Sequence, residues 1–249
     1  MTKSAFITGA GRRIGRIIAE HLASKGYALA LHAHHSAADA DALATALESK
    51  GGRAIVIEGD LADADSLASM IDSAAATLGK LSLLVNNASL FKDDTAQAFT
   101  PDQFDAHMAV NLRAPLMLAQ AFARHASQED PSIVNIIDQR VFKPNPQYFT
   151  YTLSKAALYT ATQTMAQAFA PHIRVNGVGP GPVLPNIHDG NENFMREAKG
   201  TPLACPVDPA EIARAVLYLA QARNVTGQMI AVDSGQHLGW QTPDIILKS

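Results

Sequence analysis

Short apolar segments alternate with longer alanine-rich segments along almost the whole chain, and this alternation leaves few folds open. Because the apolar runs lack a polar face, we expect strands that helices cover on both sides. Strict alternation of strands and helices is typical of a parallel sheet. The sequence therefore predicts one α/β domain over residues 1–249, a doubly wound parallel sheet of about seven strands with helices on both faces. The expected strands are 4–8, 28–32, 54–58, 81–86, 132–137, 173–178 and 229–232, and the expected helices are 13–25, 37–50, 64–78, 101–125, 151–170 and 209–220.

Composition excludes several classes of protein. The chain of 249 residues is 47% hydrophobic, which is ample for a buried core. Its net charge is −3 and its basic residues are scattered apart from Arg12 and Arg13, so we expect no nucleic-acid partner. One cysteine, Cys205, allows no internal disulfide and fits a reducing compartment. Since neither a signal peptide nor a bilayer-length apolar run is evident, we expect a cytoplasmic protein without a membrane partner.

The long irregular stretch from 179 to about 193 is rich in proline, glycine and asparagine. Segments of this length without regular structure commonly act as lids or binding loops. In doubly wound sheets, ligands bind at the carboxyl ends of the strands, where this stretch begins. We therefore expect a substrate-binding loop at about 179–200, and a surface loop without a binding role is the alternative.

The segment FITGAGRRIGRIIAEHLASKGY reads as a strand, a glycine turn and an amphipathic helix. Gly9 and Gly11 allow a tight turn that approaches a ligand, and Gly15 allows the helix to pack closely on the sheet. Free N–H groups at the start of the helix then face an anion. The spacing G-x-G-x-x-x-G is one residue longer than the usual dinucleotide fingerprint, but its position between strand and helix predicts a dinucleotide site.

The end of the second expected strand selects between the two nicotinamide dinucleotides. An NAD site typically has a carboxylate there, which binds the ribose 2′-hydroxyl. Here the sequence reads LALHAHHSA, in which His34, His35 and Ser36 can donate hydrogen bonds to a 2′-phosphate. Arg12 and Arg13 add positive charge from the first turn, and a guanidinium suits phosphate geometry. We therefore expect NADP(H) as the cofactor.

Two further polar features lie near this expected cofactor site. His32 and His34 would share one face of a strand, but no other group of metal-ligand residues is nearby in the sequence, so we expect no metal. Asp60 follows the third strand and is positioned to contact the adenine. An N-terminal cap of the next helix is the alternative role for Asp60.

Six segments occur in the order of one known family, namely TGAGRRIG, GDL, NNAS, VNLRAP, YTLSK and RVNGVGPGPV. Over about residues 4–237 the chain thereby resembles the short-chain dehydrogenase/reductase family. The resemblance implies a Rossmann-like fold, catalytic Tyr151 and Lys155, and a proton-relay or supporting role for Asn111. It also implies a homotetramer or homodimer. Besides Tyr151 and Lys155, the resemblance assigns to the cofactor site Ile14, Leu61, Asn87, Ala88, Pro180, Gly181 and Val183.

Tyr151 and Lys155 are four residues apart and therefore share one face of a helix. A free tyrosine has a pKa near 10, and a lysine cation close by favours the phenolate. We expect Lys155, together with the positive oxidised nicotinamide, to lower the pKa of Tyr151, so that the phenol serves as an acid or base near neutral pH. Lys155 would also hold the nicotinamide ribose. An ordinary helical pair without a catalytic role is the alternative.

Asp138 stands thirteen residues before Tyr151, where most of the family has a serine. The serine hydroxyl donates to a substrate carbonyl, whereas an ionised carboxylate only accepts and would repel a developing oxyanion. A carboxylate suits a C=N bond, because it stabilises the protonated nitrogen, and a neutral Asp138 could pass a proton on. The alternative is a degenerate site with impaired chemistry.

Within the family, Asp138 is a departure that resembles the pteridine reductases and the related dihydromonapterin reductases. The segment TGAGRRIG carries their arginine, Arg13, which the resemblance places at the phosphate and the pterin. The segment NNASLF supplies Ser89 and Phe91 where they have a serine and a phenylalanine, and this phenylalanine would stack the pterin against the nicotinamide. The segment PVLPNIHDG matches little, and arginine is common in these relatives where His35 stands.

The sequence therefore predicts an enzyme that uses NADPH to reduce a C=N bond of a dihydropterin, dihydromonapterin or dihydrofolate. Asp138 and Tyr151 would serve both catalysis and substrate binding, with Arg13, Ser89 and Phe91 as further substrate contacts. One alternative is a carbonyl, 3-oxoacyl or sugar reductase on the same scaffold. A non-catalytic NADP-binding sensor is a further alternative, against which the intact Tyr151–Lys155 pair argues.

Overall fold

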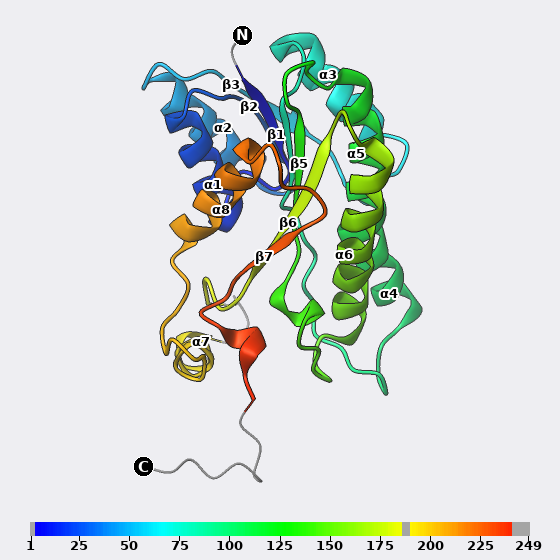
Figure 1. Ribbon diagram of the computed structural model, residues 1–249, viewed down its shortest axis with the longest axis vertical. Helices are drawn as coiled ribbons and strands as arrows, with labels where there is room; N and C mark the ends of the chain where they lie inside the picture. The colour runs from blue at the N-terminus through cyan, green and yellow to red at the C-terminus, as the bar shows by residue number, and fades with distance from the viewer. Residues whose placement is uncertain (1–2, 186–189, 241–249) are drawn as a thin grey trace.

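In the computed structural model, which describes residues 3–185 and 190–240, seven strands form one parallel sheet (Figure 1). The strand order is β3-β2-β1-β4-β5-β6-β7, so the chain winds outwards in two directions from the neighbouring strands β1 and β4. The predicted doubly wound α/β sheet is thereby confirmed. The strands are β1 (Ser4–Ile7), β2 (Ala28–Ala33), β3 (Ala54–Glu58), β4 (Leu83–Asn86), β5 (Ser132–Ile136), β6 (Arg174–Pro180) and β7 (Met229–Val232).

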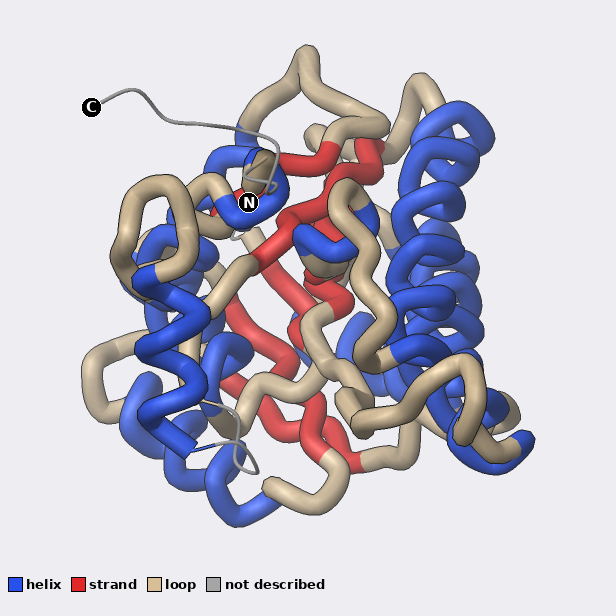
Figure 2. The backbone as a smooth tube through the Cα atoms, turned by 90° about the horizontal axis from the view of Figure 1, so that it is seen from below, coloured by secondary structure: helices blue, strands red, loops and turns tan. Residues whose placement is uncertain are grey.

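Helices cover both faces of this sheet, as Figures 1 and 2 show. One face carries α1, α2 and α8, and the other carries α3, α5 and α6, with α4 packed beside α6. Short 3-10 turns follow β5 and β7. The helices are α1 (Arg13–Ser24), α2 (Ala37–Glu48), α3 (Leu67–Leu78), α4 (Pro101–Met108), α5 (Ala114–His125), α6 (Phe149–Phe169), α7 (Gly190–Lys199) and α8 (Pro209–Gln221), with a π-helical turn η1 (Ala109–Arg113) and 3-10 turns η2 (Gln139–Val141) and η3 (Gln236–Leu238).

Apolar strand residues fill the space beneath both helical layers. Phe6 and Ile7 are neighbours in β1 and both are fully buried, yet they belong to different clusters because successive side chains point to opposite faces. Ile7 packs with Ile18 and Leu22 of α1, and Phe6 packs with Phe122 of α5 in the opposite layer. Burial of each of these side chains stabilises the fold by about 1.5–3 kcal/mol. This packing holds in place the edge of the sheet that carries the site.

The predicted single helix over 101–125 is wrong, because the π-helical turn η1 separates α4 from α5. Asn111 lies in this turn and is fully buried. Its side chain accepts a hydrogen bond from Leu90 N at 2.8 Å and donates to Leu90 O at 2.9 Å. These bonds to the neighbouring loop offset the irregular helical hydrogen bonding, and π turns occur frequently at functional sites.

The irregular stretch predicted from 179 to about 193 is only partly correct, since β6 continues to Pro180 and α7 occupies Gly190–Lys199. Glu192 in the first turn and Arg196 and Lys199 in the last turn complement the helix dipole, which favours this short helix. The part of the predicted loop at 186–189 lies outside the described residues.

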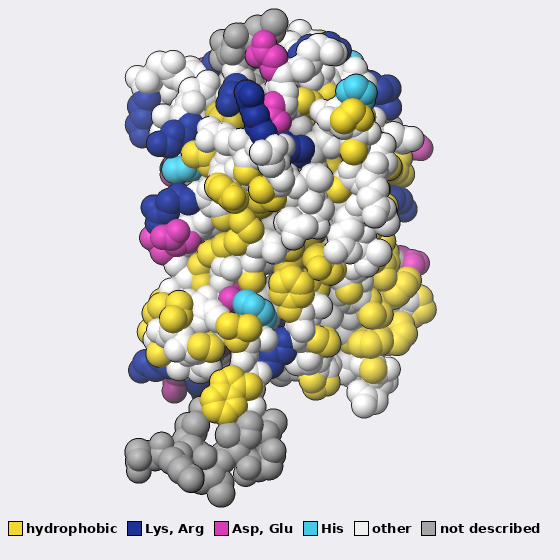
Figure 3. All heavy atoms as spheres, viewed as in Figure 1, with side chains coloured by type: hydrophobic (Ala, Val, Ile, Leu, Met, Phe, Trp, Pro, Cys, Tyr) yellow, Lys and Arg dark blue, Asp and Glu magenta, His cyan; other side chains and the backbone are white. Residues whose placement is uncertain are grey.

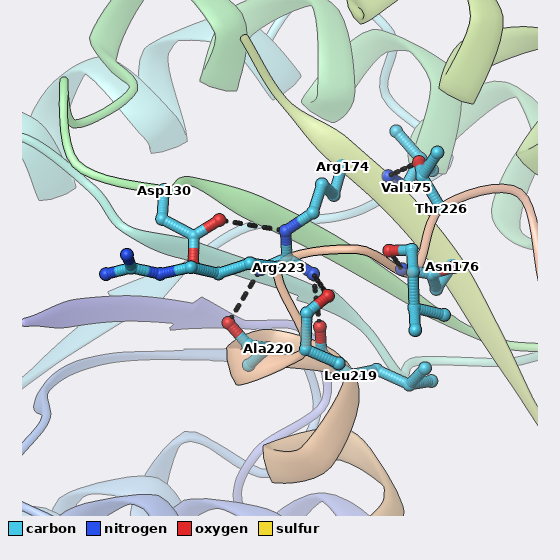
Figure 4. Close-up of polar contacts among 10 residues, drawn as sticks. Asp130, Arg174, Val175, Asn176, Leu219, Ala220, Arg223 and Thr226 are labelled. Atoms are coloured by element: carbon cyan, nitrogen blue, oxygen red, sulfur yellow. Dashed lines mark hydrogen bonds and ion pairs between the residues drawn. The ribbon is translucent and has the colours of Figure 1, made fainter. Parts of the chain in front are cut away.

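Arg174, at the start of β6, ties the amino-terminal edge of the sheet to the end of α8 (Figure 4). Its Nε donates to Asp130 Oδ1 at 2.9 Å. Its terminal nitrogens donate to the carbonyls of Leu219 at 2.6 Å, Ala220 at 2.9 Å and Ala222 at 3.0 Å. The last carbonyls of a helix have no partner within the helix, so this guanidinium caps α8 far from the carboxyl ends of the strands.

The surface carries charge of both signs without one dominant basic patch on the face that Figure 3 shows. None of the described helices is long and apolar enough to cross a membrane. Near the end of the described chain, Leu238 and Trp240 are 61% and 54% exposed. Hydrophobic side chains are also visible on the lower part of this face in Figure 3, so the C-terminal region presents apolar surface.

Candidate active site

The predicted functional residues meet at the carboxyl ends of the central strands. Ser89 and Phe91 follow β4, Asp138 follows β5, and Tyr151 lies on the first turns of α6. The strand order reverses between β1 and β4, which is the point where doubly wound sheets form their ligand crevice. Residues separated by more than sixty positions in the sequence are thereby brought to one edge.

The glycine turn after β1 is shaped for a ligand rather than for side chains. Gly9 has φ +63°, a conformation that favours glycine. A Cβ on Gly15 would lie 2.1 Å from Gly9 O and 2.6 Å from Asn87 Nδ2, so only glycine fits there. Asn87 Nδ2 donates to Thr8 O at 2.8 Å, and Ala88 N donates to Thr8 Oγ1 at 2.9 Å. These contacts fix the turn in front of α1, so the residues present fit a dinucleotide phosphate.

Three of the residues expected at the adenosine end already have partners. Arg12 Nε forms an ion pair with Asp39 Oδ2 at 2.5 Å, which holds the guanidinium beside the start of α2. His34 and His35 stack with ring centroids 3.7 Å apart, and His34 Nδ1 lies 3.8 Å from Asp60 Oδ1. The side chains expected to bind a 2′-phosphate are thus one arginine and two imidazoles, and Asp39 is a nearby counter-charge of the arginine.

Asp60 is not the N-terminal cap of a helix. Its Oδ1 accepts a hydrogen bond from Ala62 N at 2.8 Å, and the next helix, α3, begins only at Leu67. The alternative role as a cap of that helix is therefore wrong. Leu61 beside it is buried. His32 is buried as well, and Gly9 N donates to its Nδ1 at 3.2 Å, so this imidazole supports the glycine turn.

Asp138, Tyr151 and Lys155 form a connected and largely buried group. Tyr151 OH donates to Asp138 Oδ2 at 2.8 Å, and Arg140 N donates to Asp138 Oδ1 at 2.8 Å. Lys155 is only 2% exposed, and its Nζ donates to Ile136 O at 2.8 Å. Lys155 Nζ is 5.8 Å from the centre of the Tyr151 ring. The carboxylate, rather than the lysine, is the direct partner of the phenol.

The predicted lowering of the Tyr151 pKa by Lys155 does not fit this geometry. Burial, followed by the charge and the hydrogen bond of Asp138, raises the pKa of Tyr151 well above its ordinary value. Burial also raises the pKa of Asp138 and lowers the pKa of Lys155 to about 8. Both influences favour the protonated phenol, so Tyr151 carries a proton that it can donate.

Asn111 supports the site from the π turn, where it is fully buried and is not part of the cavity lining. Its Oδ1 also accepts from Ser89 Oγ at 3.2 Å, and its Nδ2 donates to Ser154 Oγ at 3.1 Å. Together with the two bonds to Leu90, these contacts engage both ends of the amide. Asn111 therefore fixes the segment with Ser89, and of the two expected roles the geometry supports the supporting one.

Phe91 belongs to an aromatic group rather than standing alone. Its ring stacks on Tyr148 with centroids 4.1 Å apart and planes 15° from parallel. The ring of Tyr151 meets Phe91 edge-on at 4.7 Å. One face of Phe91 is thus covered by Tyr148, so the expected stacking of a flat ligand on Phe91 stays a prediction that concerns its remaining surface.

A cavity of about 720 Å³ opens beside these rings. Arg13 is not part of its lining, but its Nη2 donates to Pro185 O at 3.0 Å and to Leu184 O at 3.4 Å, in the segment that follows the lining residue Val183. The residue expected at phosphate and pterin therefore also holds the start of the predicted lid. Of the residues expected in the cofactor or substrate sites, the cavity lining includes Phe91, Asp138, Pro180, Gly181 and Val183, and Ile14 lies on the first turn of α1.

Some residues of this edge were not expected from the sequence. Arg140 and Tyr148 line the cavity beside Asp138 and Phe91. Tyr148 is the N-cap of α6 and has φ +53°, an uncommon conformation for a residue other than glycine. The segment DQRV carries an arginine next to the carboxylate, which could have signalled Arg140, whereas nothing in the sequence signals the backbone of Tyr148.

A buried polar network fastens the loop of Phe91 to α6. Asp94 accepts hydrogen bonds from Thr150 N at 3.0 Å and from the Thr150 hydroxyl, which also contacts His107 Nδ1 at 2.7 Å. Lys92 N donates to His107 Nε2 at 3.3 Å. Because Nε2 accepts, Nδ1 carries the proton, and burial lowers the pKa of His107. This network holds Phe91 and Tyr151 in register.

Within residues 3–185 and 190–240, no group of three or more histidine, cysteine, aspartate or glutamate side chains is close enough to hold a metal ion. The exposed Cys205 lies 3.7 Å from Ser234 Oγ.

Comparisons with known proteins agree with this geometry. A family model described as enoyl-(acyl carrier protein) reductase matches residues 9–237. The 3-oxoacyl-[acyl-carrier-protein] reductase FabG of Staphylococcus aureus is 32% identical over 244 residues, which cover 96% of this chain and 99% of that protein. The chain belongs to the short-chain dehydrogenase/reductase family.

Solved structures of this family include proteins that are more similar in sequence. FolM alternative dihydrofolate reductase 1 of Brucella canis, solved in complex with NADP, is 44% identical with a TM-score of 0.94, covering 98% of this chain and 97% of that chain. The Brucella suis protein of the same name, also with NADP, is 44% identical with a TM-score of 0.95, covering 99% of this chain and all of that chain (100%). The resemblance of the sequence to the short-chain dehydrogenase/reductase family is confirmed.

Proposed function

We propose that this short-chain dehydrogenase/reductase uses NADPH to reduce a C=N bond of a pterin, such as a dihydropterin, dihydromonapterin or dihydrofolate. The observation that carries the proposal is the 2.8 Å hydrogen bond from Tyr151 OH to Asp138 Oδ2. A carboxylate at this position stabilises positive charge and opposes an oxyanion, which favours an imine-like centre over a ketone.

The cofactor part of the proposal is supported by the glycine turn, by Arg12 and the two stacked imidazoles, and by the NADP complexes of both Brucella proteins. NADPH supplies the hydride when it is bound. The chain contributes the proton, because burial and Asp138 keep Tyr151 protonated. The depressed pKa of Lys155, about 8, allows this amine to lose a proton near neutral pH and so to take part in resupplying Tyr151.

The substrate part is supported by the cavity and by the FolM relatives. The cavity of about 720 Å³ exceeds what a bare pterin fills and can also hold part of a longer substrate. Phe91 offers an aromatic surface beside Asp138, and flat heteroaromatic rings pack well on such surfaces. The 44% identity to two proteins named alternative dihydrofolate reductases agrees with this substrate class.

Reduction of a carbonyl or 3-oxoacyl group is the second candidate, and the FabG relatives favour it. Against it stands Asp138, because an ionised carboxylate has no hydrogen bond to donate to a carbonyl oxygen. A sensor without catalysis is a third candidate. A sensor role gives no reason for a buried Lys155, because burial of its amine lowers the stability of the fold. An enzyme tolerates this loss of stability where the amine takes part in the reaction.

The test is NADPH consumption with a 7,8-dihydropterin, a dihydrofolate, a 3-oxoacyl thioester and a set of ketones, assayed side by side. We expect turnover of at least one pterin, and its loss in Tyr151→Phe. Preferential turnover of the 3-oxoacyl thioester would replace this function by the second candidate. Tight NADPH binding without turnover of any compound would favour the sensor.

A homotetramer or homodimer and a cytoplasmic location remain parts of the proposal. The exposed Leu238 and Trp240 offer apolar surface for a second copy of the chain. Sedimentation or light scattering would measure the oligomeric state, and a monomer at micromolar concentration would contradict it.

A further inference from the structure

Arg140 lies on the 3-10 turn η2, two residues after Asp138, and its side chain is only 12% exposed. Arginines are almost never this buried without a partner that matches their charge. Its contact with a carboxylate is long, since Nε is 4.0 Å from Asp138 Oδ1. Its Nη1 is buried, and among the described residues it has no hydrogen-bond partner.

The guanidinium rests on an aromatic stack that leads to the substrate side of the site. Its Cζ lies 5.0 Å from the centre of the Tyr148 ring, and Tyr148 in turn stacks on Phe91. A cation over an aromatic face is attracted by the ring, more strongly where water is excluded. Arg140, Tyr148, Phe91 and Asp138 all line the same cavity, so the arginine is part of the cavity wall.

From these contacts we propose that Arg140 is a positioning residue, which orients Asp138 and holds it as a carboxylate facing Tyr151. The backbone N–H and the guanidinium of Arg140 both face Oδ1, which leaves Oδ2 for the Tyr151 hydroxyl. A carboxylate bound on one oxygen and free to accept on the other presents a fixed acceptor to the phenol.

Few of the charged residues that line the cavity lie close to Asp138. Among the described residues, those that act on the Asp138 carboxyl group are Tyr151 and Lys155 of α6 and Arg140 of η2. Burial raises the pKa of Asp138, and the backbone bond and charge of Arg140 are the largest influences that lower it again. Across the cavity stand further charges of both signs, namely Asp93, Lys143, Arg196 and Glu197.

Loss of the guanidinium should therefore favour the protonated form of Asp138. An opposite charge within about 4–6 Å shifts a carboxyl pKa by roughly one to three pH units. A protonated Asp138 would also be a weaker hydrogen-bond acceptor for the Tyr151 hydroxyl, and the buried site would lose one negative charge. The catalytic part of this inference rests on the proposed function, whereas the charge state of Asp138 is measurable without any substrate.

The experiment compares Arg140→Met and Arg140→Lys with the natural protein. The titration of Asp138 is followed by NMR of carboxyl-labelled aspartate, with Asp138→Asn identifying the signal. Arg214→Met is the matched control, because Arg214 pairs with Glu211 on the exposed side of α8. Circular dichroism and NADPH binding confirm that each variant is folded.

We expect Arg140→Met to raise the Asp138 midpoint by about one pH unit or more, Arg140→Lys to restore part of the shift, and Arg214→Met to leave it unchanged. The limb of the kcat/KM profile that reports Asp138 should move by the same amount. An unchanged midpoint in Arg140→Met, or an equal shift in Arg214→Met, would overturn the assignment. If Arg140→Met does not fold, Arg140→Gln takes its place because it also lacks the charge, and an unshifted Asp138 midpoint in that variant overturns the assignment.

The outcomes separate this inference from the proposed function. A shifted midpoint in a protein that reduces no pterin supports the role of Arg140 and removes the pterin assignment. Pterin turnover with an unshifted midpoint supports the assignment and removes the role of Arg140.

Discussion

Replacement of Asp138 by serine is the perturbation that most directly separates C=N chemistry from carbonyl chemistry. The carboxylate accepts two hydrogen bonds of 2.8 Å, one from Tyr151 OH and one from Arg140 N. Serine is shorter and uncharged, so the charge-assisted bond from the phenol is lost while a hydroxyl donor appears. The variant thus exchanges an acceptor for the donor that a carbonyl substrate needs.

The magnitude follows from the bond to the phenol. A hydrogen bond to an ionised group contributes about 1.5–3 kcal/mol, and about 1.4 kcal/mol corresponds to a tenfold change. We therefore expect kcat/KM for a dihydropterin to fall between about tenfold and 150-fold in Asp138→Ser. Turnover of a ketone should stay level or rise, because the new hydroxyl can donate to the carbonyl oxygen.

The assay is steady-state NADPH consumption with both substrates on the same preparation. Asp138→Asn is the matched control, since it keeps the size and one acceptor but lacks the charge. NADPH affinity should remain close to that of the natural protein in both variants, which excludes a collapsed site. If the ratio of pterin to ketone kcat/KM is the same before and after Asp138→Ser, the reasoning about this carboxylate is wrong.

Three further predictions concern the rest of the molecule. Phe91→Ala should raise the KM for a pterin several-fold in steady-state assays, and an unchanged KM would remove its stacking role. Lys155→Met should abolish turnover, yet it should raise the unfolding free energy at pH 7 by up to about 3 kcal/mol in urea titrations. The reason is that burial lowers the pKa of Lys155 from 10.5 to about 8, and each pKa unit of this shift destabilises the folded state with a charged Lys155 by about 1.36 kcal/mol. In the natural protein this cost is complete below pH 8 and disappears as the pH rises towards 10.5; a flat stability profile there would contradict it. Arg174→Met should lower the unfolding free energy by about 3–5 kcal/mol while NADPH affinity, measured by fluorescence, stays unchanged.

Much of the fold follows from patterns that operate over a few neighbouring residues. The runs at 54–58 and 229–232 became β3 and β7 without change, because apolar, β-branched sequence is sufficient for a covered strand. The glycine turn was predictable too, since the clash of a Cβ at Gly15 depends on the strand-turn-helix geometry that the motif specifies.

The misses came from contacts between segments distant in the sequence. The helix over 101–125 reads as continuous, and only the partners of Asn111 on the loop after β4 explain its π turn. The pKa of Tyr151 was predicted to fall because spacing shows the four-residue step to Lys155. It does not show that Lys155 bonds Ile136 O while Asp138 receives the phenol.

Stability and function are divided between the two edges of the sheet. At the amino edge, Arg174 has four acceptors for its guanidinium and stabilises the end of α8. At the carboxyl edge, Lys155 is buried with a depressed pKa, Arg140 has a buried nitrogen without a partner among the described residues, and Tyr148 has a left-handed backbone. Each of these features costs free energy in the folded state and would be removed by selection for stability alone. These destabilising features surround the hydrogen-bonded pair of Asp138 and Tyr151. The carboxyl edge of the sheet is therefore the place where we expect the chemistry.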